Sequence, residues 1–294
     1  MLVAALVTAY LRPEATLTTL RKLSQLAPPP DEILVHVDGN QLEIAKEIAK
    51  QFPQVRVTVS EGQVGPGGAR NILLAQCRAP YAVSLDDDSY PVDADFCDRV
   101  VRQFEEYPQA AILAADVFHK GEKIAEPTTL TPQWVDSFAG GGCAYRISML
   151  FSSMRYVPLP IAYGMEEVDL ALRLIDQGKL ILHAPTLRVF HDTDLARHAD
   201  PEVTAASIAN IALLAYLRYP PAYWWLGVAQ LASRVFWLCR VGRRRGLVRG
   251  IVMIPGYLLK HRQYRAPVSF KGMRRARALR KTPELVVVDA VRRS

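Results

Sequence analysis

Three consecutive carboxylates, Asp86, Asp87 and Asp88, directly follow a short apolar segment at residues 81–85. The segment predicts a buried strand, so these side chains stand together at a strand end, where they repel one another and lose hydration. A cation would relieve both costs, and Asp86 and Asp88 could hold Mg²⁺ or Mn²⁺ whose remaining ligands are diphosphate oxygens and water. The alternative is a solvated loop that precedes a helix near Asp93. The strand-end position favours the metal site.

A glycine-rich turn at residues 65–71, Gly-Pro-Gly-Gly-Ala-Arg-Asn, leads into a predicted helix. Backbone N–H groups at the start of a helix favour an anion, and the guanidinium of Arg70 adds a partner for phosphate. The turn has Arg70 where a dinucleotide fingerprint needs a third small residue, and it lacks the Gly-Lys-Ser/Thr end of a P-loop. It therefore predicts phosphate binding of another kind. A turn that needs glycine only for its shape is the alternative.

Two adjacent glutamates, Glu166 and Glu167, begin a predicted helix at residues 166–177. Acidic side chains at this end of a helix complement its dipole, which is their structural interpretation. After a glycine-rich loop, they could also supply the general base of a reaction. Farther along the same helix, Asp169 and Arg173 stand four residues apart and are predicted to pair on one face.

A histidine, His191, ends a predicted strand at residues 187–190. A strand-end histidine on its own is more often structural than metal-binding. Beside the acidic triplet it becomes a candidate third ligand, because the neutral imidazole is a common metal ligand.

The elements that must position these residues alternate between strands and helices up to about residue 115. Strands are predicted at 2–9, 33–37, 55–59 and 81–85, with a helix after each of the first three. This alternation predicts a mostly parallel α/β sheet with helices on both faces. Ligands bind at the carboxyl ends of such strands, so the segments that follow the four strands should converge on one crevice.

The net charge of +7 is divided unevenly along the chain. Residues 1–196 contain 17 Lys/Arg and 25 Asp/Glu, a net of −8, whereas residues 197–294 contain 19 and 4, a net of +15. The basic residues of the second part alternate with Trp, Leu, Ile and Val, without the run of about 20 apolar residues that crosses a bilayer. This pattern predicts helices that lie on an anionic membrane surface.

Four widely spaced cysteines, Cys77, Cys97, Cys143 and Cys239, form no CxxC pair and indicate neither a zinc site nor a disulfide framework. They favour a reducing compartment. The apolar N-terminus has no basic region and no clear cleavage site, so it is interpreted as a strand rather than a signal peptide. We therefore expect a cytoplasmic protein that is peripheral on the inner face of the cell membrane.

The order of these features resembles family 2 glycosyltransferases of the GT-A fold, close to their bacterial rhamnosyltransferase-like branch. Residues 7–13, Val-Thr-Ala-Tyr-Leu-Arg-Pro, resemble the first strand and loop of that family, and residues 65–71 resemble its G-x-x-x-A-R-N segment. The acidic triplet resembles its metal-binding DxD. Residues 166–170, Glu-Glu-Val-Asp-Leu, resemble its ED motif, with Glu in place of Asp as the second acid. The resemblance covers about residues 1–195.

The resemblance implies a role for each matching residue. Asp38 would contact the nucleotide base, the glycines at 140–142 would lie under the sugar and the acceptor, and Glu167, beside Glu166, would be the catalytic base. The implied metal ligands are Asp86, Asp88 and His191. The implied nucleotide-sugar contacts are Thr8, Tyr10, Arg12, Asp38, Gly67, Arg70, Asp86, Asp87, Gly141 and Gly142.

These observations predict an inverting, metal-dependent glycosyltransferase that moves a hexosyl or deoxyhexosyl group from a nucleotide-diphosphate sugar to a glycan or lipid-linked acceptor. The predicted GT-A catalytic domain is 1–196, with a nucleotide-binding half at 1–95 and an acceptor and catalytic half at 96–196; a helical, basic, membrane-associating extension follows at 197–294. A nucleotidyltransferase is one alternative, although residues 10–13 lack its glycine-rich signature. A basic-tailed nucleic-acid- or membrane-binding protein with a non-catalytic nucleotide-sugar domain is the other. No nucleic-acid partner is expected, because the tail carries no recognised reader motif.

Overall fold

The computed structural model of the chain describes residues 2–126, 131–150, 155–193 and 200–286. Every strand and helix predicted before residue 86 is present, within a few residues of its expected bounds. These elements are β1 (Val3–Ala9), α1 (Pro13–Ser24), β2 (Glu32–Val37), α2 (Leu42–Gln51), β3 (Arg56–Val59), α3 (Gly65–Gln76) and β4 (Tyr81–Asp86).

The second half of the chain adds shorter strands and the C-terminal helices. Its elements up to the tail are β5 (Ser89–Pro91), α4 (Phe96–Glu106), β6 (Ala110–His119), β7 (Gln133–Val135), β8 (Gly142–Arg146), α5 (Glu166–Asp176) and β9 (Leu180–His191). The tail contains α6 (Pro201–Arg218), α7 (Trp224–Arg240), α8 (Leu247–Val252), α9 (Ile254–Lys260), α10 (Phe270–Lys281) and β10 (Glu284–Leu285).

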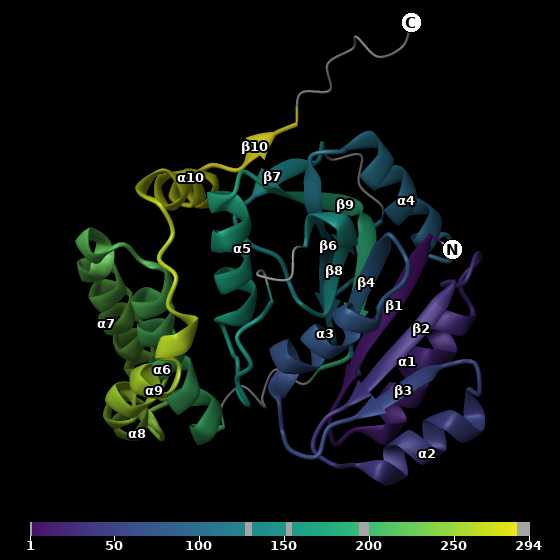
Figure 1. Ribbon diagram of the computed structural model, residues 1–294, viewed down its shortest axis with the longest axis horizontal. Helices are drawn as coiled ribbons and strands as arrows, with labels where there is room; N and C mark the ends of the chain where they lie inside the picture. Colours follow the sequence, from purple (N-terminus) through teal and green to yellow (C-terminus); the bar gives the residue numbers. More distant parts are fainter. Residues whose placement is uncertain (1, 127–130, 151–154, 194–199, 287–294) are drawn as a thin grey trace, which may run out of the picture.

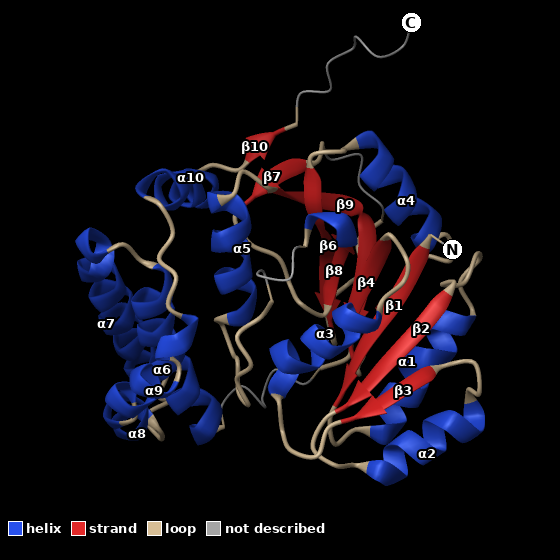
Figure 2. Cartoon of the chain, viewed as in Figure 1, coloured by secondary structure: helices blue, strands red, loops and turns tan. Residues whose placement is uncertain are grey.

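Within the described residues, the strands form one sheet in the order β10-β7-β9-β6-β8-β4-β1-β2-β3, with β5 paired to β9 (Figure 2). Parallel pairs join β1 to β2 and β4, β2 to β3, and β6 to β9. In contrast, β8 runs antiparallel between β4 and β6, and β7 runs antiparallel to β9. The prediction of a mostly parallel sheet is therefore wrong for the second half. Parallel neighbours need a long crossover, and no described residue between β6 and β8 is helical, so the chain reverses direction there.

Helices cover both faces of the sheet, as predicted, because alternate residues of a strand point to opposite sides. Val3, Ala5 and Val7 of β1 join a core with α1, α2 and α4. Ala4 and Leu6 join a second core with α3 and α5. The sheet thus fixes its loops from both sides, and the carboxyl ends of β1, β2 and β4 lie next to one another (Figure 1).

The C-terminal helices pack against α5 rather than standing apart from the sheet domain (Figure 1). A third core joins Met165, Leu172 and Ile175, at and within α5, to side chains of α6 and α10, including Leu213 and Met273. No helix in the described part of the chain combines the length and apolar character needed to cross a bilayer.

A buried ion cluster reinforces this packing. Arg218, the last residue of α6, donates to the carboxylate of Asp169 in α5 and to the carbonyl oxygen of Tyr264 at 2.7 Å. Arg173 pairs with the same carboxylate at 2.8 Å, which confirms the predicted pairing along α5. The tail is therefore tied to the helix that begins with the two adjacent glutamates.

Candidate active site

A cleft of about 500 Å³ opens at the carboxyl ends of β1, β2 and β4, beside the start of α5. The residues that follow these strands converge there, as the sheet prediction requires. Nine of the predicted site residues line it, namely Thr8, Tyr10, Arg12, Asp38, Arg70, Asp86, Asp87, Glu166 and Glu167. The lining does not include Gly67, Asp88, Gly141, Gly142 or His191.

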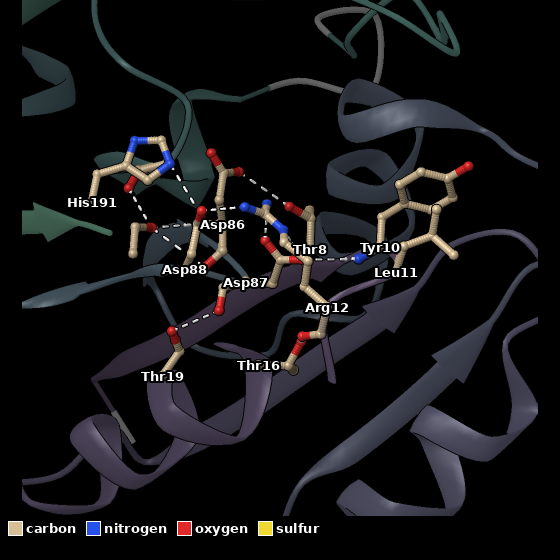
Figure 3. A network of polar contacts seen from close by, with 12 residues as sticks. Thr8, Tyr10, Leu11, Arg12, Thr16, Thr19, Asp86, Asp87, Asp88 and His191 are labelled. Carbon is tan, nitrogen blue, oxygen red and sulfur yellow. Dashed lines mark hydrogen bonds and ion pairs between the residues drawn. The ribbon is translucent and has the colours of Figure 1, made fainter. Parts of the chain in front are cut away.

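The acidic triplet is neutralised largely by arginine. The guanidinium of Arg12 forms ion pairs with both Asp87 and Asp88 (Figure 3). The backbone N–H of Tyr10 also donates to Asp87, at 3.1 Å. Burial nevertheless raises the pKa of Asp87 to about 7, against the opposing effect of Arg12. The positive charge that was predicted beside these carboxylates is therefore supplied in part by the guanidinium of Arg12.

Asp88 also pairs with the histidine that ends β9. Its buried Oδ1 lies 3.0 Å from Nε2 of His191, close enough for an ion pair. A carboxylate oxygen and an imidazole nitrogen that face each other form a donor pair suited to a divalent transition metal. Among the described residues, no group of three or more His, Cys, Asp or Glu side chains is already arranged to hold a metal ion. A cation held here would need further ligands from outside the protein.

Asp38 lies at the glycine-rich turn. Its carboxylate accepts hydrogen bonds from the backbone N–H groups of Val64 and Gly65, at 2.8 and 2.9 Å, and from the hydroxyl of Ser60 at 2.9 Å. The N–H groups of the N-cap and of the first residue of α3 are therefore bonded to a side chain of the protein. Gly65 adopts φ +74°, and a Cβ there would lie 1.8 Å from the carbonyl oxygen of Leu159, so this position requires glycine.

Arg70 joins the acidic triplet to the start of α5. Its side chain is only 1% exposed. The guanidinium donates to Asp86 and Glu166, both at 2.6 Å, and to the hydroxyl of Ser84 at 3.1 Å. Although predicted to bind phosphate, Arg70 has each of its guanidinium nitrogens bonded to a protein group. It therefore holds two carboxylates from distant segments at one end of the cleft.

The two glutamates at the start of α5 have different surroundings. Glu166 is 5% exposed and paired with Arg70, and burial raises its pKa to about 8. Glu167 is half-buried, and its Oε1 accepts a hydrogen bond from the N–H of Gly140 at 3.2 Å. Desolvation raises its pKa too, against the opposing effect of Arg70. A raised pKa brings a carboxylate closer to the range in which it works well as a general base near neutral pH.

The glycines at 140–142 allow the strand β8 to approach these groups. A Cβ at Gly141 would lie 2.3 Å from Oδ2 of Asp86, and one at Gly140 would lie 2.7 Å from both Arg70 and Glu167. Ser89 fixes the approach, because its hydroxyl donates to the carbonyl oxygen of Gly141 at 2.8 Å. Larger residues at 140 or 141 would therefore displace the carboxylates of the cleft.

The sequence did not predict the contribution of the C-terminal helices to this site. The segment 160–164 forms part of the cleft lining, and Asn210 of α6 donates to the carbonyl oxygens of Ile161 and Tyr163 at 3.0 and 3.1 Å. Tyr257 of α9 in turn donates to Asn210 at 3.2 Å. An asparagine within an apolar helical stretch is the signal that could have revealed this role, since such a residue must find buried partners.

Comparison with known protein families identifies this arrangement. The model of the family described as glycosyl transferase family 2 matches residues 5–156, which is more than half of the chain. The chain belongs to glycosyl transferase family 2. No curated protein sequence gives a significant match.

Solved structures share the GT-A glycosyltransferase fold of this family 2 member at low sequence identity. GalNAc-T7 with UDP, GalNAc and Mn²⁺ gives a TM-score of 0.62 at 14% identity, over 89% of this chain and 58% of that one. The mannosyltransferase PcManGT of Pyrobaculum calidifontis, with GDP-Man and Mn²⁺, gives a TM-score of 0.55 at 13% identity, over 89% of this chain and 86% of that one. S. aureus TarS 1–349 with UDP gives a TM-score of 0.52 at 16% identity, over 82% of this chain and 73% of that one. The match spans 44% of the longer TarS chain.

Proposed function

We propose that this family 2 member transfers a sugar from a nucleotide-diphosphate sugar to a hydroxyl group of a glycan or lipid-linked acceptor, with inversion at the anomeric carbon. The observation that carries the proposal is the meeting of Asp86, Arg70 and Glu167 in one cleft at the strand ends. The nucleotides bound in the TarS, GalNAc-T7 and PcManGT structures support a donor of this class. A hexosyl or deoxyhexosyl group, and a place in the rhamnosyltransferase-like branch, stay predictions.

The proposed reaction is a single displacement. Glu167 takes the proton of the acceptor hydroxyl while that oxygen attacks the anomeric carbon, and the bond from this carbon to the diphosphate breaks. One displacement from the opposite face inverts the anomeric centre. Arg70 keeps Glu166 and Asp86 in place beside the base. The nucleoside diphosphate then leaves.

A divalent cation is part of the proposal. Asp88 and His191, with Asp86, would hold Mg²⁺ or Mn²⁺, which when bound would stabilise the negative charge that develops on the departing diphosphate. The approach of Oδ1 of Asp88 to Nε2 of His191, at 3.0 Å, supports this assignment. The Mn²⁺ ions of the GalNAc-T7 and PcManGT structures agree with it.

The donor and metal proposals can be tested together by thermal unfolding. One or more nucleotide sugars should raise the Tm with Mn²⁺ and raise it less with EDTA, because a ligand at 100 times its Kd stabilises the folded state by about 2.7 kcal/mol. Asp88→Asn should reduce the metal-dependent part. Asp98→Asn, an exposed carboxylate of α4, is the matched control. Stabilisation that is equal with EDTA and in Asp88→Asn would contradict the metal, and no stabilisation by any nucleotide sugar would contradict the donor.

We also propose that α7 and α8 dock on an anionic membrane. Trp225, Val228 and Phe236 follow helical spacing on one face of α7 and are exposed, Phe236 by 69%. Val248 of α8 is 75% exposed. Basic residues lie in and beside these helices at 240, 243–245 and 249, and among them only Arg249 has a carboxylate partner in the described chain. Exposed aromatic and aliphatic side chains beside unpaired arginines suit a bilayer interface.

This membrane surface predicts a measurable loss on mutation. The double variant Phe236→Ser/Val248→Ser should bind vesicles containing anionic lipid about tenfold or more weakly, because each apolar side chain contributes about 1.5–3 kcal/mol on burial. Leu42→Ser on α2, also exposed, is the control that should sediment with vesicles like the wild type. Equal co-sedimentation of both variants would contradict docking through α7 and α8.

A further inference from the structure

A second cavity, of about 680 Å³, lies between α5, α6, α7 and α10. We refer to it as the tail groove. Gly164 lines both the tail groove and the candidate active site, and Val168 of α5 also lines the groove. Figure 1 shows α5 between the sheet on one side and the α6–α7 pair on the other. A molecule in the tail groove would therefore lie next to the helix that carries Glu167, on the side built by the C-terminal helices.

Aromatic rings hold the guanidinium of Arg234 in the tail groove. Its central carbon lies 4.8 Å from the ring centre of Trp237 and 5.9 Å from that of Tyr163. Tyr163 is itself part of the active-site lining. The only hydrogen bonds of this guanidinium within the described residues are two contacts of 3.4 Å to the hydroxyl of Ser207. Arg234 is thus positioned by cation–π contacts and retains N–H donors for a ligand.

The charge of the tail groove is only partly balanced by the protein. In the described part of the chain, neither Arg234 nor Arg280, which also lines the groove, forms an ion pair with a carboxylate, although Arg280 interacts electrostatically with Asp136. Arg234 is half-buried and Arg280 is exposed, whereas the buried Arg70 and Arg218 are paired with Glu166 and Asp169. Two arginines that line one groove give it a positive charge that suits an anionic ligand.

We propose that the tail groove binds a phosphate group carried by the acceptor, with Arg234 and Arg280 as its charged partners. This proposal rests on the proposed function, because it assigns the groove to the acceptor of that reaction. Guanidinium groups bind phosphate through paired N–H donors, and the exposed ring of Trp237 gives an apolar surface for the rest of the molecule. Gly164 lines both cavities, so in this proposal the other end of the acceptor extends into the cleft, toward Glu167.

The test uses the full-length chain and four small probes, glucose 1-phosphate, glucuronate, inorganic phosphate and glucose, with binding measured by ligand-detected NMR in EDTA. Glucose 1-phosphate should bind about tenfold or more weakly to Arg234→Gln and to Arg280→Gln, because each loses a charge-assisted contact. Arg240→Gln removes the same charge from the exposed end of α7 and should match the wild type. Asp88→Asn, altered in the cleft, should keep the groove binding.

Four outcomes would overturn the assignment. Equal affinity for glucose 1-phosphate in all variants would show that the groove does not take phosphate. A response to glucuronate alone would assign it to a carboxylate. Binding of inorganic phosphate as tight as that of glucose 1-phosphate would assign it to a free anion rather than to an acceptor. Selective loss of anionic-vesicle binding in Arg234→Gln, with probe binding unchanged, would assign it to lipid headgroups. Failure of the proposed function appears separately, as wild-type protein that no nucleotide sugar stabilises.

Discussion

Glu167→Gln should lower kcat by about 10²–10⁴-fold, the usual contribution of a general base, while the donor still raises the Tm as it does in the wild type. Glutamine keeps the shape of the side chain and its contact with the N–H of Gly140 but cannot accept the proton of the acceptor hydroxyl. The loss should not be recovered by more acceptor, because the base acts in the chemical step. Steady-state kinetics with a saturating donor measures this effect.

Glu166→Gln is the matched comparison, since it changes the neighbouring carboxylate by the same single atom. Glu166 is bonded to Arg70 at 2.6 Å and is more deeply buried than Glu167. Its replacement should therefore act mainly on stability and on the placement of Arg70, with a smaller effect on kcat. If Glu166→Gln instead removed catalysis and Glu167→Gln left it intact, the roles of the two glutamates would be reversed.

Arg70→Met should lower the free energy of unfolding by about 3–5 kcal/mol, because it leaves the buried Glu166 and the partly buried Asp86 without their counter-charge. The guanidinium contacts Asp86 and Glu166, which come from β4 and from the start of α5. Methionine fills much of the space but supplies no positive charge. Urea unfolding measures the effect as a lower midpoint with an unchanged slope.

Two further variants identify the cause of this loss. Arg70→Met/Glu166→Gln should be more stable than Arg70→Met alone, since it removes one of the unpaired charges. Arg56→Met breaks the half-exposed pair with Glu32 and should cost only up to about 1 kcal/mol. If Arg70→Met lost as little stability as Arg56→Met, the ion pairs of Arg70 with Asp86 and Glu166 would not be what holds the site together.

Much of the candidate site follows from local pattern. Apolar segments of strand length before Tyr10, Asp38 and Asp86 predict three parallel strands, and these strands do lie side by side with their carboxyl ends together. The ends of parallel strands must meet at one edge, so the convergence of these loops needs no knowledge of long-range contacts. The pairing of Asp169 with Arg173 was equally predictable, because four residues bring two side chains onto one helix face.

The partners of the charged groups were not predictable in the same way. The sequence suggested a phosphate for Arg70 and for the glycine-rich turn, whereas Arg70 binds Glu166 and the turn binds Asp38. These contacts join residues 96 and 27 positions apart. Which opposite charge lies nearest depends on how the whole chain is packed, and residue types alone leave several candidates for each arginine.

The basic character of the C-terminal part was evident from the sequence. The sequence did not show which of its helices pack against the sheet domain and which keep apolar side chains exposed. Composition alone predicted amphipathic helices rich in arginine beyond residue 197. The tertiary structure divides them, because α6 and α10 bury apolar side chains against α5, while α7 and α8 leave Phe236 and Val248 exposed. The sequence pattern of an apolar helix face predicts that the face is buried, but it does not identify the surface that buries it. Whether the protein or something outside it does the covering is decided by the packing of the complete fold.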